Sequence, residues 1–116
     1  ASAPTAKTSG MKIAWTTVGS RAAADQLATG AVAAQLAACV QIDGPVRSVY
    51  RWQDRIEVSE EFRLTFKCLA AALPALESYV LGHHPYDTPE WIIVNVDAVT
   101  EKYLSWVRAA SSPSTL

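Results

Sequence analysis

The residues best suited to chemistry form one short segment, His83-His84-Pro85-Tyr86-Asp87-Thr88-Pro89-Glu90. Imidazoles beside carboxylates are typical ligands of copper and zinc, so we predict a metal site made of His84, Glu90 and His83. Pro85 favours an extended backbone at His84, so the two imidazole rings should diverge and His84 is the stronger ligand. The alternative is that His84 orders this segment by hydrogen bonds while His83 faces solvent.

A second set of side chains indicates a small-molecule site. Glu90 begins an apolar run, where a carboxylate is unfavourable unless it is paired. Lys67 is its expected partner, and Glu61 or Arg63 could join the pair. Together with Tyr50 and Tyr86, this pair predicts a cleft for a small anionic ligand, lined by Lys67, Tyr50 and Tyr86. The alternative is that Lys67 and Glu90 form a salt bridge between subunits.

The sequence lacks the motifs of the common catalytic classes. It has no glycine-rich phosphate loop, no Ser-His-Asp arrangement and no paired-histidine helix motif, so we expect no enzymatic turnover. The least favoured alternative is a cofactor-free enzyme that uses His84 and Glu90 as acid and base.

The chain has only two cysteines, too few for a disulfide scaffold. Cys39 and Cys68 are expected to pack as small apolar residues in a reducing, cytoplasmic location.

Composition narrows the function classes further. Of the 116 residues 50% are hydrophobic and 18% charged, and the net charge is −1. Such a chain can bury the core of one domain. A near-neutral charge argues against a protein built to bind nucleic-acid backbones. No stretch reaches the roughly 20 apolar residues of a membrane span. We therefore expect neither nucleic acid nor membrane among its partners.

The hydrophobic pattern predicts the elements that position these residues. They are a strand at 12–18, a helix over 21–38, a long antiparallel hairpin from 39 to 68 with its turn at 53–55, a helix from 70 to a glycine cap at Gly82, a strand at 91–96 and a last helix from 101 to 107. The continuously apolar run 91–96 is typical of a central strand that is covered on both faces. Gly30 inside the first helix indicates close packing against the sheet.

This β-α-β-β-α-β order with a terminal helix predicts an α+β, ferredoxin-like domain over 11–110, with an antiparallel sheet and two helices on one face. Residues 1–10 are expected to be a flexible leader and 111–116 a flexible tail. The long hairpin and the open sheet face leave strand edges and aromatic residues that proteins usually cover with a partner. We therefore expect a homo-oligomer.

Four runs of residues, in this order and at these intervals, resemble the CutA divalent-cation-tolerance family: Leu36-Ala37-Ala38-Cys39-Val40, Ser48-Val49-Tyr50-Arg51-Trp52, His84 to Glu90, and Tyr103-Leu104-Ser105-Trp106. The resemblance implies a tight homotrimer in which hairpins of neighbouring subunits extend one another's sheets. Trp52, Tyr103 and Trp106 are the expected trimer-interface residues. The resemblance also implies a role in tolerance of copper or other divalent metals.

Two functions remain open at this point. One is a homotrimer that binds copper, another divalent metal or a small anionic ligand in a cleft between subunits. The alternative is a structural or interaction trimer with no small-molecule site. Val18 stands where some relatives of this family carry a cysteine, which removes one soft ligand for copper.

Overall fold

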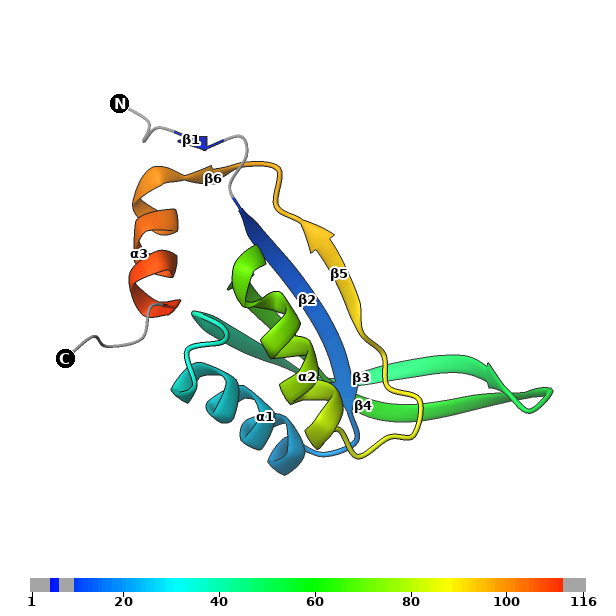
Figure 1. Ribbon diagram of the computed structural model, residues 1–116. Helices are drawn as coiled ribbons and strands as arrows, with labels where there is room; N and C mark the ends of the chain where they lie inside the picture. Colours follow the sequence, from blue (N-terminus) through cyan, green and yellow to red (C-terminus); the bar gives the residue numbers. More distant parts are fainter. Residues whose placement is uncertain (1–4, 7–9, 112–116) are drawn as a thin grey trace.

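The computed structural model describes residues 5–6 and 10–111 and shows an α+β fold with one main sheet (Figure 1). This sheet is antiparallel, with the strand order β3-β4-β2-β5. Its strands are β2 (Met11–Val18), β3 (Cys39–Trp52), β4 (Arg55–Leu69) and β5 (Ile92–Asn95). Helix α1 (Arg21–Ala33) links β2 to β3, and α2 (Leu73–His83), after a 3-10 turn at Ala70–Ala72, links β4 to β5. Each helix therefore joins two strands that are separated by one other strand.

The ends of the described chain lie together. Strand β1 (Thr5–Ala6) pairs with β6 (Val99–Thr100), and helix α3 (Glu101–Ser111) follows β6 directly. Thr5–Ala6 thus forms a strand within the predicted leader. The rest of that leader, except Gly10, and residues 112–116 of the predicted tail lie outside the described residues, so those expectations stay predictions.

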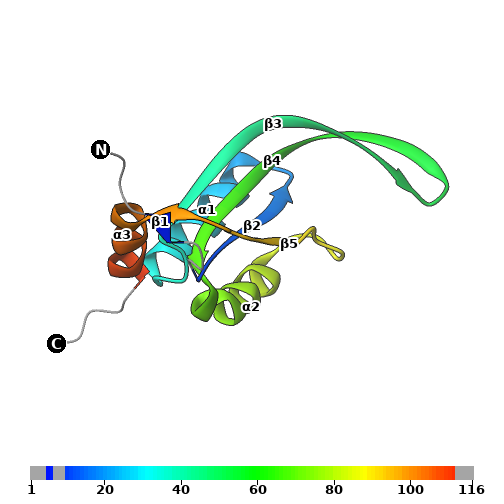
Figure 2. The same cartoon turned by 90° about the horizontal axis from the view of Figure 1, so that it is seen from above.

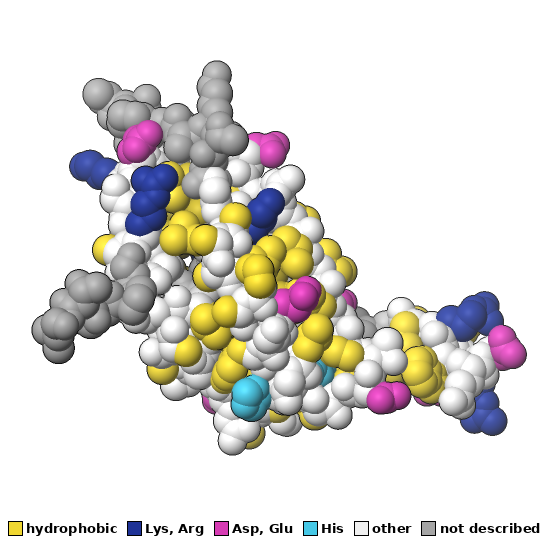
Figure 3. Space-filling view, viewed as in Figure 1, with side chains coloured by type: hydrophobic (Ala, Val, Ile, Leu, Met, Phe, Trp, Pro, Cys, Tyr) yellow, Lys and Arg dark blue, Asp and Glu magenta, His cyan; other side chains and the backbone are white. Residues whose placement is uncertain are grey.

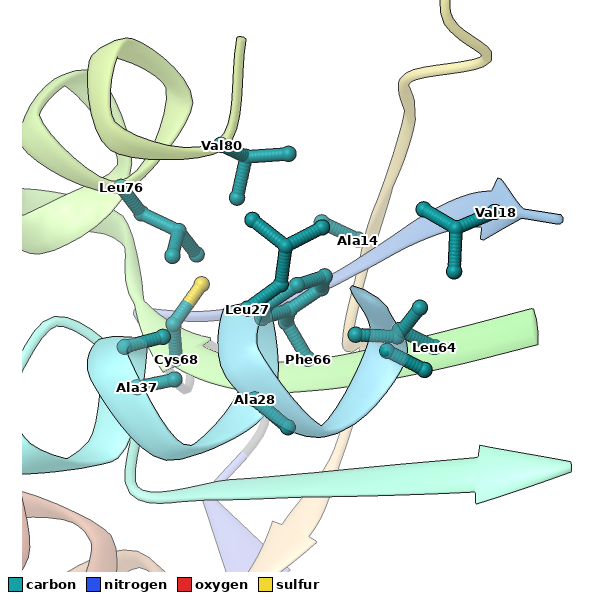
Figure 4. Close-up of a cluster of buried hydrophobic side chains, with 12 residues drawn as sticks. Ala14, Val18, Leu27, Ala28, Ala37, Leu64, Phe66, Cys68, Leu76 and Val80 are labelled. Atoms are coloured by element: carbon teal, nitrogen blue, oxygen red, sulfur yellow. The ribbon is translucent and has the colours of Figure 1, made fainter. Parts of the chain in front are cut away.

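The main core fills the space between helices α1 and α2 and one face of the sheet (Figure 4). Side chains alternate across a strand, so every second residue of β2 and β4 points to the helices. These residues are Ala14, Val18, Leu64, Phe66 and Cys68, and all are fully buried. The small side chains of α1 let that helix lie close to the sheet, and Leu76 and Val80 of α2 close the core.

Helix α1 begins as the sequence predicts but ends earlier. The Ser20 side chain accepts a hydrogen bond of 3.1 Å from the backbone N–H of Ala23, which caps the helix. The helix ends at Ala33 rather than at 38, because Gln35 takes a left-handed conformation with φ of 60° and turns the chain towards β3. The alanine-rich pattern continues through this turn, so periodicity alone could not locate it.

Gly30 packs closely, but against a helix rather than the sheet. A Cβ atom at Gly30 would overlap the hydroxyl group of Tyr79 on α2. That hydroxyl lies 3.4 Å from the carbonyl oxygen of Gln26, to which it donates. The glycine therefore sets the distance between α1 and α2.

The predicted hairpin is confirmed, and its outer part extends beyond the sheet as a curved, two-stranded arm, residues 46–61 (Figure 2). A register shift between Asp43 and Val46 marks a bulge where the arm leaves the sheet. At its tip Gln53 and Asp54 both have positive φ, 49° and 62°. This left-handed pair gives a tight turn that suits twisted strands.

Strand β5 corrects one expectation. It lies at an edge of the sheet and pairs with β2 alone among the described strands, so it is not a central strand. Its side chains are exposed, and Ile92 is 49% exposed. A continuously apolar run indicates that both faces of a strand are to be covered, but it does not say whether the cover comes from the same chain.

Candidate functional site

The two histidines point to different parts of the molecule, as expected. Helix α2 continues through Gly82, the predicted cap, and ends at His83, after which His84 is extended (φ −74°, ψ 135°) because it precedes a proline. The His83 Nδ1 atom lies 2.8 Å from the carbonyl oxygen of Tyr79, and its ring packs on the Tyr79 ring. His84 instead turns towards strand β2.

His84 uses both ring nitrogens to fix the loop that follows it, His84–Glu90. Its Nδ1 accepts a hydrogen bond of 3.1 Å from the backbone N–H of Tyr86, so the ring proton sits on Nε2. The Nε2–H group lies 3.0 Å from the carbonyl oxygen of Thr17 and 3.0 Å from Oγ1 of Thr16. The Thr16 hydroxyl, fully buried, donates in turn to the carbonyl oxygen of Glu90 at 2.6 Å.

These hydrogen bonds fit the alternative that we gave for His84, in which it orders the loop rather than binds a metal. Burial lowers the pKa of His84, against the opposing effects of the Thr17 hydrogen bond and the Glu61 charge, so the ring stays neutral. A metal ion at His84 would have to replace one of these hydrogen bonds. Among the residues that the structure describes, no three His, Cys, Asp or Glu side chains are placed to hold one metal ion. A metal role for His84, Glu90 and His83 therefore stays a prediction and lacks a complete ligand set in one chain.

Tyr86 connects the loop to the base of the arm. Its hydroxyl donates a hydrogen bond of 3.0 Å to Oε2 of Glu61 on β4. Burial, this hydrogen bond and the Glu61 charge together raise the pKa of Tyr86 to about 12. Tyr86 is therefore neutral and acts as an anchor, and its contact brings the loop and the arm to opposite sides of one groove.

The groove between arm and loop has a volume of about 870 Å³, within the range of small-molecule sites. It is lined by Thr17, Ser48, Val49, Tyr50, Trp52, Ser59, Glu61, Pro85, Tyr86, Asp87, Thr88 and Glu90. Its ionisable groups besides tyrosine are the carboxylates Glu61, Asp87 and Glu90, without a lysine, arginine or histidine. Burial and the neighbouring Glu61 raise the pKa of Glu90, and only Arg63 opposes this.

The structure brings Tyr50, Tyr86 and Glu90 together but places Lys67 elsewhere. The Lys67 Nζ atom lies 5.8 Å from the centre of the Tyr103 ring of α3. Lys67 and Glu61 are on the same face of β4 but six residues apart, roughly 20 Å along the strand. The predicted pairing of Lys67 with Glu90 is therefore not formed within one chain.

The three predicted interface residues remain accessible. Trp52, on the arm, is 53% exposed and Trp106, on α3, is 48% exposed. Tyr103 is half-buried, and its ring lies 5.6 Å from that of Trp106 between centroids. Nothing in one chain tests their role at an interface.

Sequence reasoning missed Thr16 and gave Glu61 only a minor place. Thr16 falls on the buried face of β2 with Ala14 and Val18, and a polar residue in that position indicates a required hydrogen bond. Glu61 gave no such signal, because it lies in an ordinary alternation of polar and apolar residues.

Comparison with known proteins identifies the family. Residues 12–110 match the CutA1 divalent ion tolerance protein family. The divalent-cation tolerance protein CutA of Yersinia pestis (strain Pestoides F) is 37% identical over 89 residues, which are 77% of this chain and 75% of that protein. The chloroplastic CutA of Arabidopsis thaliana is 34% identical over 96 residues, 83% of this chain but only 53% of the plant protein. This chain belongs to the CutA1 family.

A solved structure shows the same fold. CutA of Synechococcus elongatus PCC7942 is 37% identical and superposes with a TM-score of 0.89, covering 94% of this chain and 96% of that one. A second structure of the Synechococcus protein, described as complexed with a Bis-Tris molecule, has a TM-score of 0.85 at 36% identity and covers 92% and 99% of the two chains. In the described part of this chain, no helix is both long and apolar enough to span a membrane.

Proposed function

We propose that this chain is a homotrimeric divalent-cation-tolerance protein that binds a cation in the groove between the arm and the His84–Glu90 loop. The observation that carries this proposal is the set of groove carboxylates, Glu61, Asp87 and Glu90, because the described residues that line the groove include no basic side chain. Arg63, whose charge reaches Glu90, is itself paired with Asp43. A site of this charge attracts cations and repels anions. Of the two ligands expected from the sequence, the proposal therefore keeps the cation and drops the small anion, because the anion depended on Lys67.

The trimer rests on the shape of the chain. The arm carries apolar side chains on both faces and projects from the body, where one chain leaves them uncovered (Figure 3). Ile56 is 71% exposed. So much apolar surface in contact with water is unfavourable unless another subunit covers it. With the open edge of β5, the arm supports a ferredoxin-like subunit whose sheet is extended by its neighbours. Because one wall of the groove is the arm, a neighbouring subunit would lie close to the site.

Copper or another divalent metal is the first cation to test. The carboxylates supply oxygen ligands, and further ligands would come from a neighbouring subunit. Calorimetric titration of the trimer with Cu(II) should show binding that Glu61→Gln and Glu90→Gln each weaken about tenfold, while the exposed Glu77→Gln on α2 leaves it unchanged. His84→Ala separates the two metal hypotheses. If His84→Ala loses Cu(II) binding while the carboxylate variants keep it, His84 rather than the groove carboxylates is the metal ligand.

A second proposal is a structural trimer with no small-molecule site, favoured by the exposed apolar residues of the arm. Sedimentation equilibrium would distinguish the two. A structural role requires that Ile56→Glu dissociates the trimer and that no groove variant changes any ligand affinity.

Under either proposal we expect no turnover. A cytoplasmic location stays a prediction, and the chloroplastic name of the Arabidopsis relative shows that family members can occupy other compartments.

A further inference from the structure

We propose that the groove binds an organic ammonium compound, a small molecule whose positively charged nitrogen is held between the groove carboxylates and the aromatic side chains beside them. This inference rests on the proposed function, in which the groove binds a cation, and it names the class of that cation. Its basis is the combination of three features in one cavity: uncovered aromatic rings, acidic groups, and donors spaced for an organic molecule rather than for a bare metal ion.

The aromatic side chains are the first feature. Tyr50 and Trp52 from the arm and Tyr86 from the loop all line the groove. In one chain, Tyr50 is 44% exposed and Tyr86 37% exposed, so both leave ring surface available to a ligand, whereas Trp52 is also an expected trimer-interface residue. A cation over an aromatic face is attracted by the electrons of the ring, and quaternary ammonium groups are commonly recognised in this way. A hydrated metal ion gains much less from such surfaces.

The charge of the groove is the second feature. Burial raises the pKa of Glu90, and the charge of Glu61 adds to this, so Glu61 lies close enough to act on the Glu90 carboxyl group. The charge of Arg63 acts on Glu90, but its guanidinium is joined to Asp43 in an ion pair of 3.2 Å. Tyr86 gives Glu61 a hydrogen bond and no charge. A ligand that carries a positive charge would relieve the repulsion between the two carboxylates.

The spacing of the donors is the third feature, and it separates an ammonium compound from a bare metal ion. A divalent metal needs several ligands at about 2.0–2.6 Å from one point. The described residues contain no such cluster of three. An ammonium group is larger and tolerates a wider arrangement of one or two carboxylates and ring faces, and the groove volume of about 870 Å³ leaves room for its substituents.

The test compares choline with 3,3-dimethylbutan-1-ol, a neutral molecule of nearly the same shape, on the full-length trimer by calorimetry or ligand-observed NMR. Choline should bind at one site per subunit, and the neutral molecule at least tenfold more weakly. Glu90→Gln and Glu61→Gln should each weaken choline binding about tenfold, and Tyr50→Leu about 3- to 30-fold. The control Glu77→Gln should leave choline binding unchanged.

Four outcomes would overturn this inference. Equal binding of the neutral molecule would show that charge is not recognised. Absence of saturable choline binding in a trimer that still binds Cu(II) through Glu90 would reject the ammonium compound and leave the proposed function intact, whereas absence of both would reject the two together. Dissociation of the trimer by Glu61→Gln or Glu90→Gln, with no choline binding in the wild type, would show that a neighbouring subunit fills the groove.

Discussion

The hydroxyl of Tyr86 donates a hydrogen bond of 3.0 Å to Oε2 of Glu61, and so joins the loop after α2 to the base of the arm. Tyr86 reaches Glu61 because His84 holds the start of the loop on β2, through hydrogen bonds at both ring nitrogens. The groove therefore depends on two polar links in series. Four predictions test these links and the packing beneath them.

The Tyr86–Glu61 contact predicts a stability loss at alkaline pH. The pKa of Tyr86 is raised from its ordinary value of 10.0 to about 12. A raised pKa stabilises the fold below the unfolded value, and this contribution is lost as pH rises from about 10 through about 12. Absorbance titration at 295 nm should show one late-titrating tyrosine, and Glu61→Gln should lower its pKa. An unchanged titration curve in that variant would contradict the contact, and Tyr103→Phe, on α3 and away from the groove, serves as a control that keeps it.

His84 predicts a stability loss at acidic pH. Its pKa is lowered by burial, so the fold favours the neutral ring. Below the ordinary pKa of 6.5 the unfolded chain takes up a proton that the folded chain resists. This contribution to stability is therefore present above that pH and is lost as pH falls through the folded pKa. His84→Ala should reduce stability at pH 8 by about 1–3 kcal/mol and flatten the change in melting temperature between pH 8 and pH 5. His83→Ala, the matched control at an exposed ring, should reduce stability at pH 8 by less than His84→Ala does.

Thr16 predicts a large effect from a small change. Thr16→Val keeps the shape of a fully buried side chain but removes the hydroxyl that donates to the carbonyl oxygen of Glu90. We expect a loss of about 1–3 kcal/mol in chemical denaturation, since a buried polar group loses its partner. Thr65→Val, on the opposite face of the sheet, should cost less than 0.5 kcal/mol, roughly the range of a surface substitution. Equal effects from the two variants would show that the Thr16 hydroxyl carries no special role.

Gly30 predicts that a helix-favouring substitution destabilises the protein. Gly30→Ala should gain up to about 1 kcal/mol of helix propensity, but its Cβ would overlap the Tyr79 hydroxyl. Overpacking of this kind costs about 1–3 kcal/mol, so a net loss is expected in denaturant titration. The double variant Gly30→Ala with Tyr79→Ala should lose less than the sum of the two single variants. Strict additivity would contradict the contact.

The loop illustrates how far local sequence can go. The proline after His84 already indicated that its ring would diverge from that of His83, because proline restricts the residue before it. It could not indicate what His84 would meet. Its partners Thr16 and Thr17 lie 68 and 67 positions away in the chain, and only the pairing of β2 with its neighbouring strands brings them together.

The ligand site shows the same division. Its aromatic and acidic residue types were visible in the sequence, and Tyr50, Tyr86 and Glu90 do meet in one groove. The predicted pairing of Glu90 with Lys67 is not formed within one chain. Residue type suggests that opposite charges pair, but it does not tell where along a strand each charge lies. The register of β4 decides it, since it places Glu61 beside the loop and Lys67 beside α3.

The sequence by itself determined the order of helices and strands, the long hairpin and the family, because alternation, helical periodicity and local motifs are properties of neighbouring residues. Tertiary structure decided where α1 ends, that β5 is an edge strand, and that Tyr86 reaches Glu61. Each of these depends on contacts between residues that are distant in the chain. Such contacts cannot be read from the local pattern of apolar and polar residues. The segment from His83 to Glu90 thus supplied candidate ligands along one wall of a groove, while strand register decided that the groove is acidic.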